Sequence, residues 1–183
     1  TSHSLNVASL TMALAQYAGY TADQVRAVGV AGVLHDIGKV LVPREVLNRN
    51  GPLTAEERAL VERHPVDGAR MILESGDAGL ELAAIVAYEH HMRYDGGGYP
   101  QPSRRRACHP ASDLLHVCDV YDAMATHRPY RAAWPEPKIL QMIEDEAGTQ
   151  FEPASARLFL EMMRSLQGRV RVLSDASADA GSV

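Results

Sequence analysis

Hydrophobic residues recur along most of the chain at the three- and four-residue spacing that one face of an α-helix requires. The first stripe ends at Gly19 and comprises Val7, Leu10, Leu14 and Ala18. The second follows Thr21 or Asp23, either of which can cap a helix, and ends at Gly38. The same spacing predicts helices over residues 54–62, 65–75, 79–90, 110–126, 136–147 and 153–167. Since no stretch alternates with period two for long, the pattern predicts an all-α fold.

Turn-forming and charged residues interrupt this pattern. Thr54 with Glu57 three residues later is typical of a capping box at a helix start. Segment 94–108 holds consecutive glycines, two prolines and then Arg104–Arg106, and we interpret it as a loop with solvated arginines. After Leu173 the chain is rich in Ser, Asp, Ala and Gly. We therefore expect one domain over residues 1–173 and a disordered tail over residues 174–183.

Composition and charge narrow the classes of protein. The chain has 183 residues, 46% of them hydrophobic and 22% charged, which suits one folded domain and excludes wholesale disorder. A formal net charge of -5 argues against binding to polymeric nucleic acid. No apolar run reaches the roughly 18 residues of a membrane span and no signal peptide is recognisable, so we expect a cytoplasmic protein. Because the chain opens without Met in a helical pattern, we expect a piece of a longer protein.

Histidine and aspartate occur in adjacent pairs at the ends of apolar stripes. His35-Asp36 ends one predicted helix and His90-His91 ends another. A single histidine is more often a core or surface residue than a ligand. Neighbouring side chains on a helix, however, point about 100° apart, so an adjacent pair can straddle two ions. Imidazole and carboxylate together suit borderline divalent metals, among them iron, manganese, zinc and nickel.

Six segments, in this order, resemble the HD-GYP family, a branch of the HD phosphohydrolases. They are His35–Lys39, His64-Pro65, His90-His91, Asp95–Pro100, Asp119–Ala123 and Arg128–Arg131. The resemblance runs from about His3 to Phe159. It implies an HD-domain bundle of about seven or eight helices around a di-metal centre. It also implies metal-dependent hydrolysis of the bacterial second messenger cyclic di-GMP, by a metal-bridging hydroxide, to linear pGpG, with GMP as the alternative final product.

The resemblance assigns the metal ligands residue by residue. Asp36 is expected to bridge two divalent ions. Iron or manganese is expected, with zinc or nickel as alternatives. The first ion would be held by His3, His35 and Asp119, and the second by His64, His90 and His91. Some family members hold a third metal partly through a Glu one helical turn before the first His, a position that would precede Thr1.

Four further positions are expected to serve the substrate. Lys39 lies near the scissile phosphate in the family, and with the bridging ligand Asp36 it is an expected catalytic residue. Arg128 and Arg131 match basic positions that contact the phosphates. Tyr99, in the loop that names the family, is a further expected substrate contact. Only four residues separate His91 from the glycines of this loop, about 13–14 Å if fully extended, so we expect the loop beside the metal centre.

The chain departs from the family pattern around these positions. Met92 stands where Glu is common, Ser112-Asp113-Leu114 stands where Ala-Arg-Ile is common, and the whole segment 101–114 is unusual. The departures remove no expected ligand but alter the surroundings of the site. The remaining histidines fall outside the ligand positions, and we interpret them as structural or surface residues: His109, His116 and His127.

Two other functions stay open from the sequence. One is a phosphohydrolase of another nucleotide, and the other is a catalytically weak cyclic di-GMP receptor or partner-binding module. The complete ligand set favours an enzyme, whereas the unusual loop favours the receptor. The resemblance is also compatible with an upstream sensor or receiver domain, with partners of the diguanylate cyclase type, and with a homodimer.

Overall fold

The computed structural model describes residues 2–49, 51–102, 106–127 and 132–180. Over these residues the fold is helical, and the β-pairing consists of two isolated bridges, Met92 with Gly98 and Ala147 with Phe151. The all-α prediction is therefore confirmed. The α-helices are α1 (Ser2–Tyr17), α2 (Ala22–Leu34), α3 (Arg44–Leu47), α4 (Ala55–Val61), α5 (His64–Glu74), α6 (Glu81–Glu89), α7 (Pro110–Ala125), α8 (Glu136–Asp145) and α9 (Pro153–Ala180). Two 3₁₀ turns complete the order, η1 (Ile37–Leu41) and η2 (Ala78–Leu80).

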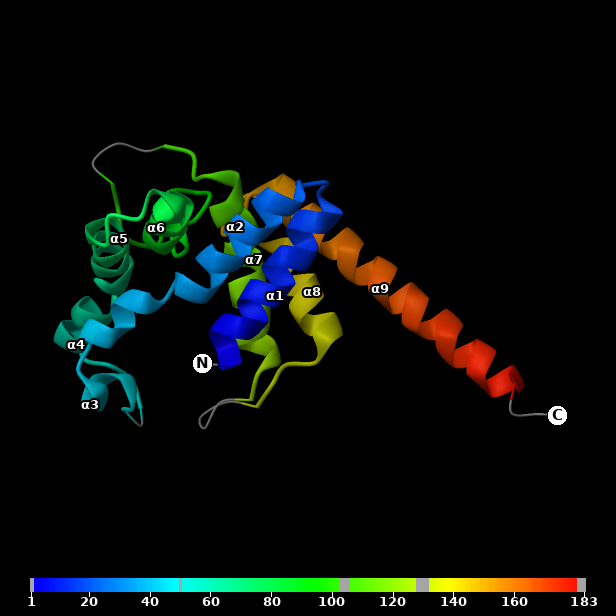
Figure 1. Ribbon diagram of the computed structural model, residues 1–183. Helices are drawn as coiled ribbons and strands as arrows, with labels where there is room; N and C mark the ends of the chain where they lie inside the picture. Colours follow the sequence, from blue (N-terminus) through cyan, green and yellow to red (C-terminus); the bar gives the residue numbers. More distant parts are fainter. Residues whose placement is uncertain (1, 50, 103–105, 128–131, 181–183) are drawn as a thin grey trace.

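The helices pack around α1 and α7, which lie side by side at the centre (Figure 1). Helix α2 packs along α1 and against α6, and α5 packs against α6 and η1. Helix α9 covers α7 and α8 and then projects away from the rest of the molecule (Figure 1). No helix in the described part of the chain is both long and apolar enough to cross a membrane.

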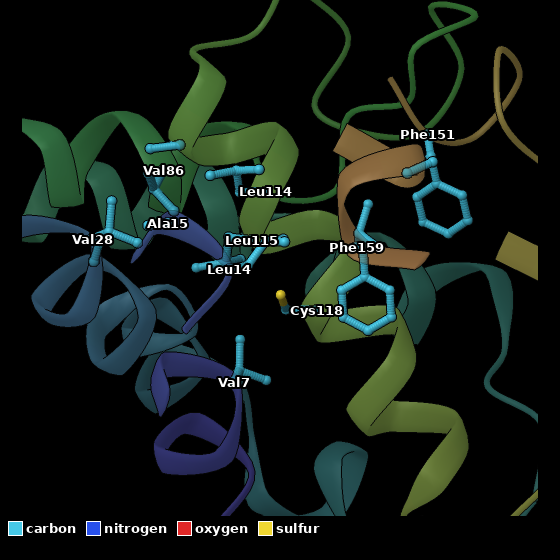
Figure 2. Packing of buried hydrophobic residues seen from close by; sticks show 14 of the residues in the cluster. Val7, Leu14, Ala15, Val28, Val86, Leu114, Leu115, Cys118, Phe151 and Phe159 are labelled. Atoms are coloured by element: carbon cyan, nitrogen blue, oxygen red, sulfur yellow. The ribbon is translucent and has the colours of Figure 1, made fainter. Parts of the chain in front are cut away.

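A continuous hydrophobic core joins these helices. Figure 2 shows Leu14 of α1 and Leu115 of α7 close to Cys118, with Phe159 of α9 on the other side. All four side chains are buried, and Phe151 and Phe159 are the largest of the fully buried residues. Such close packing lets the core hold the helix ends in fixed relative positions. Those helix ends carry most of the chemistry described below.

Local signals set the helix starts. Thr21 and not Asp23 caps α2, where its side chain accepts from Gln24 N and the Gln24 side chain accepts from Thr21 N. The predicted capping box at α4 is present, with Thr54 Oγ1 accepting from Glu57 N at 3.2 Å and Glu57 Oε2 accepting from Thr54 N at 2.8 Å. Each box satisfies backbone donors that the helix itself leaves unpaired.

The prediction that the second helix ends at Gly38 is wrong. Helix α2 ends at Leu34, the chain turns at His35-Asp36, and Gly38 lies inside η1. A β-carbon on Gly38 would lie 2.1 Å from His64 O and 2.6 Å from Gly68 N. The glycine is therefore required by the close approach of η1 to α5, which sets Asp36 beside His64.

The last helix is longer than the 153–167 stretch that the pattern predicts. Helix α9 continues to Ala180 and so enters the segment 174–183 for which we predict disorder. Its serine and alanine residues do not break a helix once the preceding turns have formed, because extending a helix costs less than nucleating one. Residues 181–183 lie outside the described residues, and the domain boundary at 173 stays a prediction.

Replacing Gly38 by Ala tests the close approach of η1 to α5. We expect Gly38→Ala to lower the free energy of unfolding by about 1–3 kcal/mol, because the new methyl group meets backbone atoms that cannot move aside. Chemical denaturation measures this. Gly168→Ala is the control, since a β-carbon at Gly168 meets nothing within 4 Å. Equal stability of Gly38→Ala and the native protein would contradict the packing described.

Asp113 predicts a pH-dependent stability. Burial, with Glu152 and Glu89 adding to it, raises the pKa of Asp113 to about 7, whereas an unfolded Asp titrates near about 3.9. The folded state therefore binds this proton more tightly, and stability declines as pH rises between these two values. We expect Asp113→Asn to raise the melting temperature relative to the native protein at pH 8 but not at pH 4. A difference independent of pH would contradict the shift.

Candidate metal centre

Six of the seven expected ligands lie where helices begin or end, and the seventh, Asp119, lies inside a helix. His3 lies in the first turn of α1, His64 begins α5, and Asp119 lies within α7. His35-Asp36 follows α2 and His90-His91 follows α6. Their ligand atoms form two groups, each with all atoms within 4.8 Å of one another: Asp36, His64, His90 and His91 in one, and His3, His35 and Asp119 in the other. The groups adjoin, since the His35 and His90 rings are 5.0 Å apart.

Three of the histidines are held by the same backbone contact. The Nδ1 atom of His35 lies 2.7 Å from Gly32 O, that of His64 2.7 Å from Val61 O, and that of His90 2.8 Å from Ala87 O. A carbonyl oxygen only accepts, so each Nδ1 carries the proton. A ring with its proton on Nδ1 directs the lone pair of Nε2 away from its own helix, as in metal-binding histidines.

These lone pairs face one another and a carboxylate. The Nε2 atoms of His64 and His90 are 3.1 Å apart, and Asp36 Oδ1 lies 3.2 Å from the former and 3.6 Å from the latter. His35 Nε2 and Asp36 Oδ1 are buried, and neither has a hydrogen-bond partner among the residues that the structure describes. Buried acceptors that converge without donors are costly unless a cation lies among them. The donor set therefore fits a divalent metal.

The charge states also suit metal binding. Burial, with the neighbouring His90 adding to it, lowers the pKa of His91 to about 2, so that its imidazole is neutral. Burial alone raises the pKa of Asp36, but the polar groups around its carboxylate, among them the Lys39 ammonium at 2.6 Å, outweigh burial and hold its pKa below the usual range. A neutral imidazole and an ionised carboxylate are the forms that bind metal.

Asp36 lies between the two groups. Its Oδ1 faces His64 and His90, and its Oδ2 lies 3.5 Å from His35 Nε2 and 2.6 Å from Lys39 Nζ. One oxygen thus points at each group, the arrangement that a bridging carboxylate needs. The Lys39 ammonium sits at the edge of the same site.

Asp122 is a residue of this site that the sequence analysis did not single out. Its Oδ2 lies 2.7 Å from His3 Nδ1, and its Oδ1 accepts from Asn6 Nδ2 at 3.1 Å. His3 Nε2 in turn lies 3.0 Å from Asp119 Oδ1. Asp122 orients His3 as the carbonyls orient the other histidines. The signal in the sequence is its position three residues after Asp119, on the same face of a helix.

A cavity of about 440 Å³ opens above the ligands. Lys39, Tyr99, His116 and Gln150 are among its lining residues, together with His3, His64, His91 and Asp119. The Tyr99 ring lies 4.7 Å from that of His91 and 6.2 Å from that of His64. The loop after α6 therefore lies beside the ligand groups, at the place expected from its distance along the chain.

Comparison with known proteins establishes the family. The family model described as HD domain matches residues 1–155. The chain belongs to the HD domain family. Divalent metal binding, which this family implies, agrees with the converging ligand atoms. The resemblance found in the sequence is confirmed.

Two relatives and one solved structure illustrate the similarity. A cyclic di-GMP phosphodiesterase of Pseudomonas aeruginosa is 39% identical over 87% of this chain and 38% of its own length. A 3′3′-cGAMP-specific phosphodiesterase of Vibrio cholerae is 30% identical over 87% of this chain and 30% of its own length. The chain thus spans less than half of either relative. An HDGYP protein of Bdellovibrio bacteriovorus shares the fold, with a TM-score of 0.69 at 19% identity over 88% of this chain and 51% of that one.

The structure leaves two expected substrate contacts of the HD domain undescribed and gives two other residues contacts that the sequence did not predict. Arg128 and Arg131 lie outside the described residues, and their substrate role stays a prediction. His116 is buried, as a structural histidine would be, but its Nδ1 donates to His90 O at 2.7 Å and it also lines the cavity. Arg106 is exposed over about half of its side chain, as expected for a solvated arginine, but its guanidinium also pairs with the buried Glu89 at 2.5 Å. Arg104 and Arg105 lie outside the described residues. The chain folds back after the loop and brings Arg106 to the end of α6.

We expect Asp122→Asn to weaken metal binding by the HD domain. The amide cannot hold His3 by a charge-assisted contact, and loss of such an orienting partner typically costs about 10–100-fold in metal affinity. Competitive titration with a chelator measures this, with Asp145→Asn, at the end of α8, as the control. Unchanged affinity in Asp122→Asn would show that His3 needs no orienting carboxylate or is not a ligand.

Proposed function

We propose that this HD domain is a metal-dependent phosphodiesterase that hydrolyses cyclic di-GMP to linear pGpG, with GMP as the alternative final product. The observation that carries the proposal is the pair of adjoining ligand groups with Asp36 between them, open to a cavity with Lys39 on its wall. The relative from Pseudomonas aeruginosa named for this activity supports the choice of substrate.

The seven residues have distinct roles in the proposed site. His3, His35 and Asp119 would hold one ion, His64, His90 and His91 the other, and Asp36 would bridge them. Two divalent ions, when bound, supply a hydroxide at neutral pH and offset the charge of a phosphodiester. We propose iron or manganese, since nitrogen and carboxylate donors are mixed, with zinc or nickel as alternatives.

The other cavity residues bind and orient the substrate. Lys39 places an ammonium group beside Asp36, where it can donate to a phosphate oxygen and stabilise charge that develops in the transition state. Burial raises the pKa of Tyr99, so its hydroxyl stays protonated and serves as a donor. Its ring, lying against His91, offers a face on which a base can stack. Arg128 and Arg131 would add contacts to the phosphates.

Two alternatives are tested beside this function. A phosphohydrolase of another cyclic dinucleotide is favoured by the relative named as specific for 3′3′-cGAMP. A receptor that binds without turnover is favoured by the unusual segment 101–114. The cytoplasmic location, an upstream sensor or receiver domain, cyclase-type partners and a homodimer stay predictions.

Product analysis decides between these functions. We expect protein reconstituted with iron or manganese to contain about two metal ions per chain and to convert cyclic di-GMP to pGpG, as seen by chromatography. Removal of the metal with a chelator is expected to abolish turnover. Faster turnover of 3′3′-cGAMP supports the other substrate, and binding of cyclic di-GMP without product supports the receptor.

Two substitutions separate metal ligation from substrate contact. Asp36→Ala is expected to lose both bound metal and turnover, because one carboxylate serves both ions. Lys39→Ala is expected to keep its metal and lose about 10²–10³-fold in kcat, the usual effect of removing a donor to developing charge. Elemental analysis and kinetics measure both. Equal metal loss in the two variants would show that Lys39 supports the ligand groups instead of the substrate.

A further inference from the structure

Glu89 is a buried carboxylate that the proposed reaction does not use. It is the last residue of α6, directly before His90 and His91, and its side chain has no exposed surface. An ionised group in this position must be paired and hydrogen-bonded, because burial of an isolated charge is very costly. Its partners therefore indicate what it holds in place.

Among the described residues, the partners of Glu89 come from the end of the 94–108 loop and from the start of α7. Arg106 Nη1 lies 2.5 Å from Glu89 Oε1. His109 N donates to Glu89 Oε2 at 2.8 Å, and Ser112 Oγ donates to the same oxygen at 2.7 Å. One buried carboxylate thus joins the end of α6, the last part of the loop and the first turn of α7.

The first part of the same loop is also fixed to the ligand residues. Tyr99 N donates to His91 O at 3.2 Å, and a β-carbon on Gly98 would lie 2.1 Å from that oxygen. The chain therefore contacts the end of α6 twice, once on each side of residues 103–105. A small cavity of about 210 Å³ lies along this loop, and Gly97, Pro100 and Arg106 are among its lining residues.

The positions where the chain departs from the family pattern gather here. Met92 Sδ lies 3.9 Å from Cys108 Sγ, and Ser112 contacts Glu89. Met92 carries no charge with which to hold an arginine, whereas Glu89, three residues earlier, does. In the unusual segment 101–114, Arg106, Cys108 and Ser112 thus contact Glu89 or Met92, the residues on either side of His90-His91.

We propose that Glu89 is a positioning residue, which acts through its ion pair with Arg106 to keep the loop, and with it Tyr99, against His91 and the substrate cavity. The effect on substrate rests on the proposed function, whereas the effect on the loop does not. Arg106 is half exposed and Glu89 is buried, so the pair can be broken from its exposed end without cutting into the core.

Arg106→Gln tests the proposal without disturbing the metal ligands. We expect hydrogen exchange of the Tyr99 amide to increase by about tenfold, the usual order for loss of a charge-assisted contact. We expect a similar rise in KM for cyclic di-GMP, with little change in kcat at saturation and with native metal content. Arg106→Lys is expected to show smaller increases in exchange and in KM than Arg106→Gln, since lysine keeps the positive charge that pairs with Glu89.

Two further variants make the test specific. Arg164→Gln is the matched control, because Arg164 is also more than half exposed and pairs with Glu144 away from the site. Glu89→Gln should reproduce the effects of Arg106→Gln, and the double variant should add little, because both changes remove one interaction. If Glu89→Gln fails to fold, the Arg106 variants still decide the question.

Each outcome of these experiments either supports or overturns the proposed role of Glu89. Native exchange at Tyr99 in Arg106→Gln overturns the loop attachment, whether or not the protein hydrolyses cyclic di-GMP. Faster exchange with unchanged KM overturns the positioning role. Faster exchange and raised KM, both partly rescued by lysine, support the proposal. If the native protein shows no turnover, the proposed function fails. The present inference is then tested by hydrogen exchange at Tyr99 together with the dissociation constant for cyclic di-GMP, which takes the place of KM.

Discussion

The arrangement of this protein depends on an electrostatic constraint: atoms that repel one another must be held within a small volume. Asp36 Oδ1 and the Nε2 atoms of His64 and His90 lie 3.1–3.6 Å apart in the interior. In an unfolded chain, these acceptors would move apart and be hydrated. Here His35, His64 and His90 are each held by a carbonyl of the preceding turn, and Asp122 holds His3 in the same way. A divalent cation resolves the repulsion, so the same contacts that oppose the apo fold favour the metal-bound one.

The helical bundle supplies the rigidity that this constraint demands. Ligands stand at the first turns of α1 and α5, just after α2 and α6, and inside α7, so a shift of any one helix would change a ligand distance. The core of α1, α7 and α9 prevents such shifts through close packing (Figure 2). Gly38 has the complementary role, since only a residue without a side chain lets η1 approach α5 and bring Asp36 to His64. Core packing and the glycine at position 38 thus both fix the distances between the ligand residues.

The sequence predicted the class of fold from local signals, and it predicted the ligand set from the resemblance of six ordered segments to the HD-GYP family. Helical spacing and capping residues are properties of neighbouring positions, and the boxes at Thr21 and Thr54 form as such signals require. Adjacent His-Asp and His-His pairs are rare enough, in their order along the chain, to indicate a metal centre before any coordinates. Gly38 shows the limit of such signals, since a helix stop and a close backbone approach both call for glycine.

Only the tertiary structure decided which partners meet. Glu89, Arg106 and Ser112 are separated by up to 23 residues, and nothing in their local sequence distinguishes a buried ion pair from solvated charge. Asp122 likewise gains its role from His3, which lies 119 residues away along the chain. Long-range contacts arise from how helices pack, and packing depends on the shapes of all side chains in the core together. The sequence by itself therefore determined the helices and the ligand types, whereas the fold decided their neighbours, because hydrogen bonds and charges act through space over only a few ångströms.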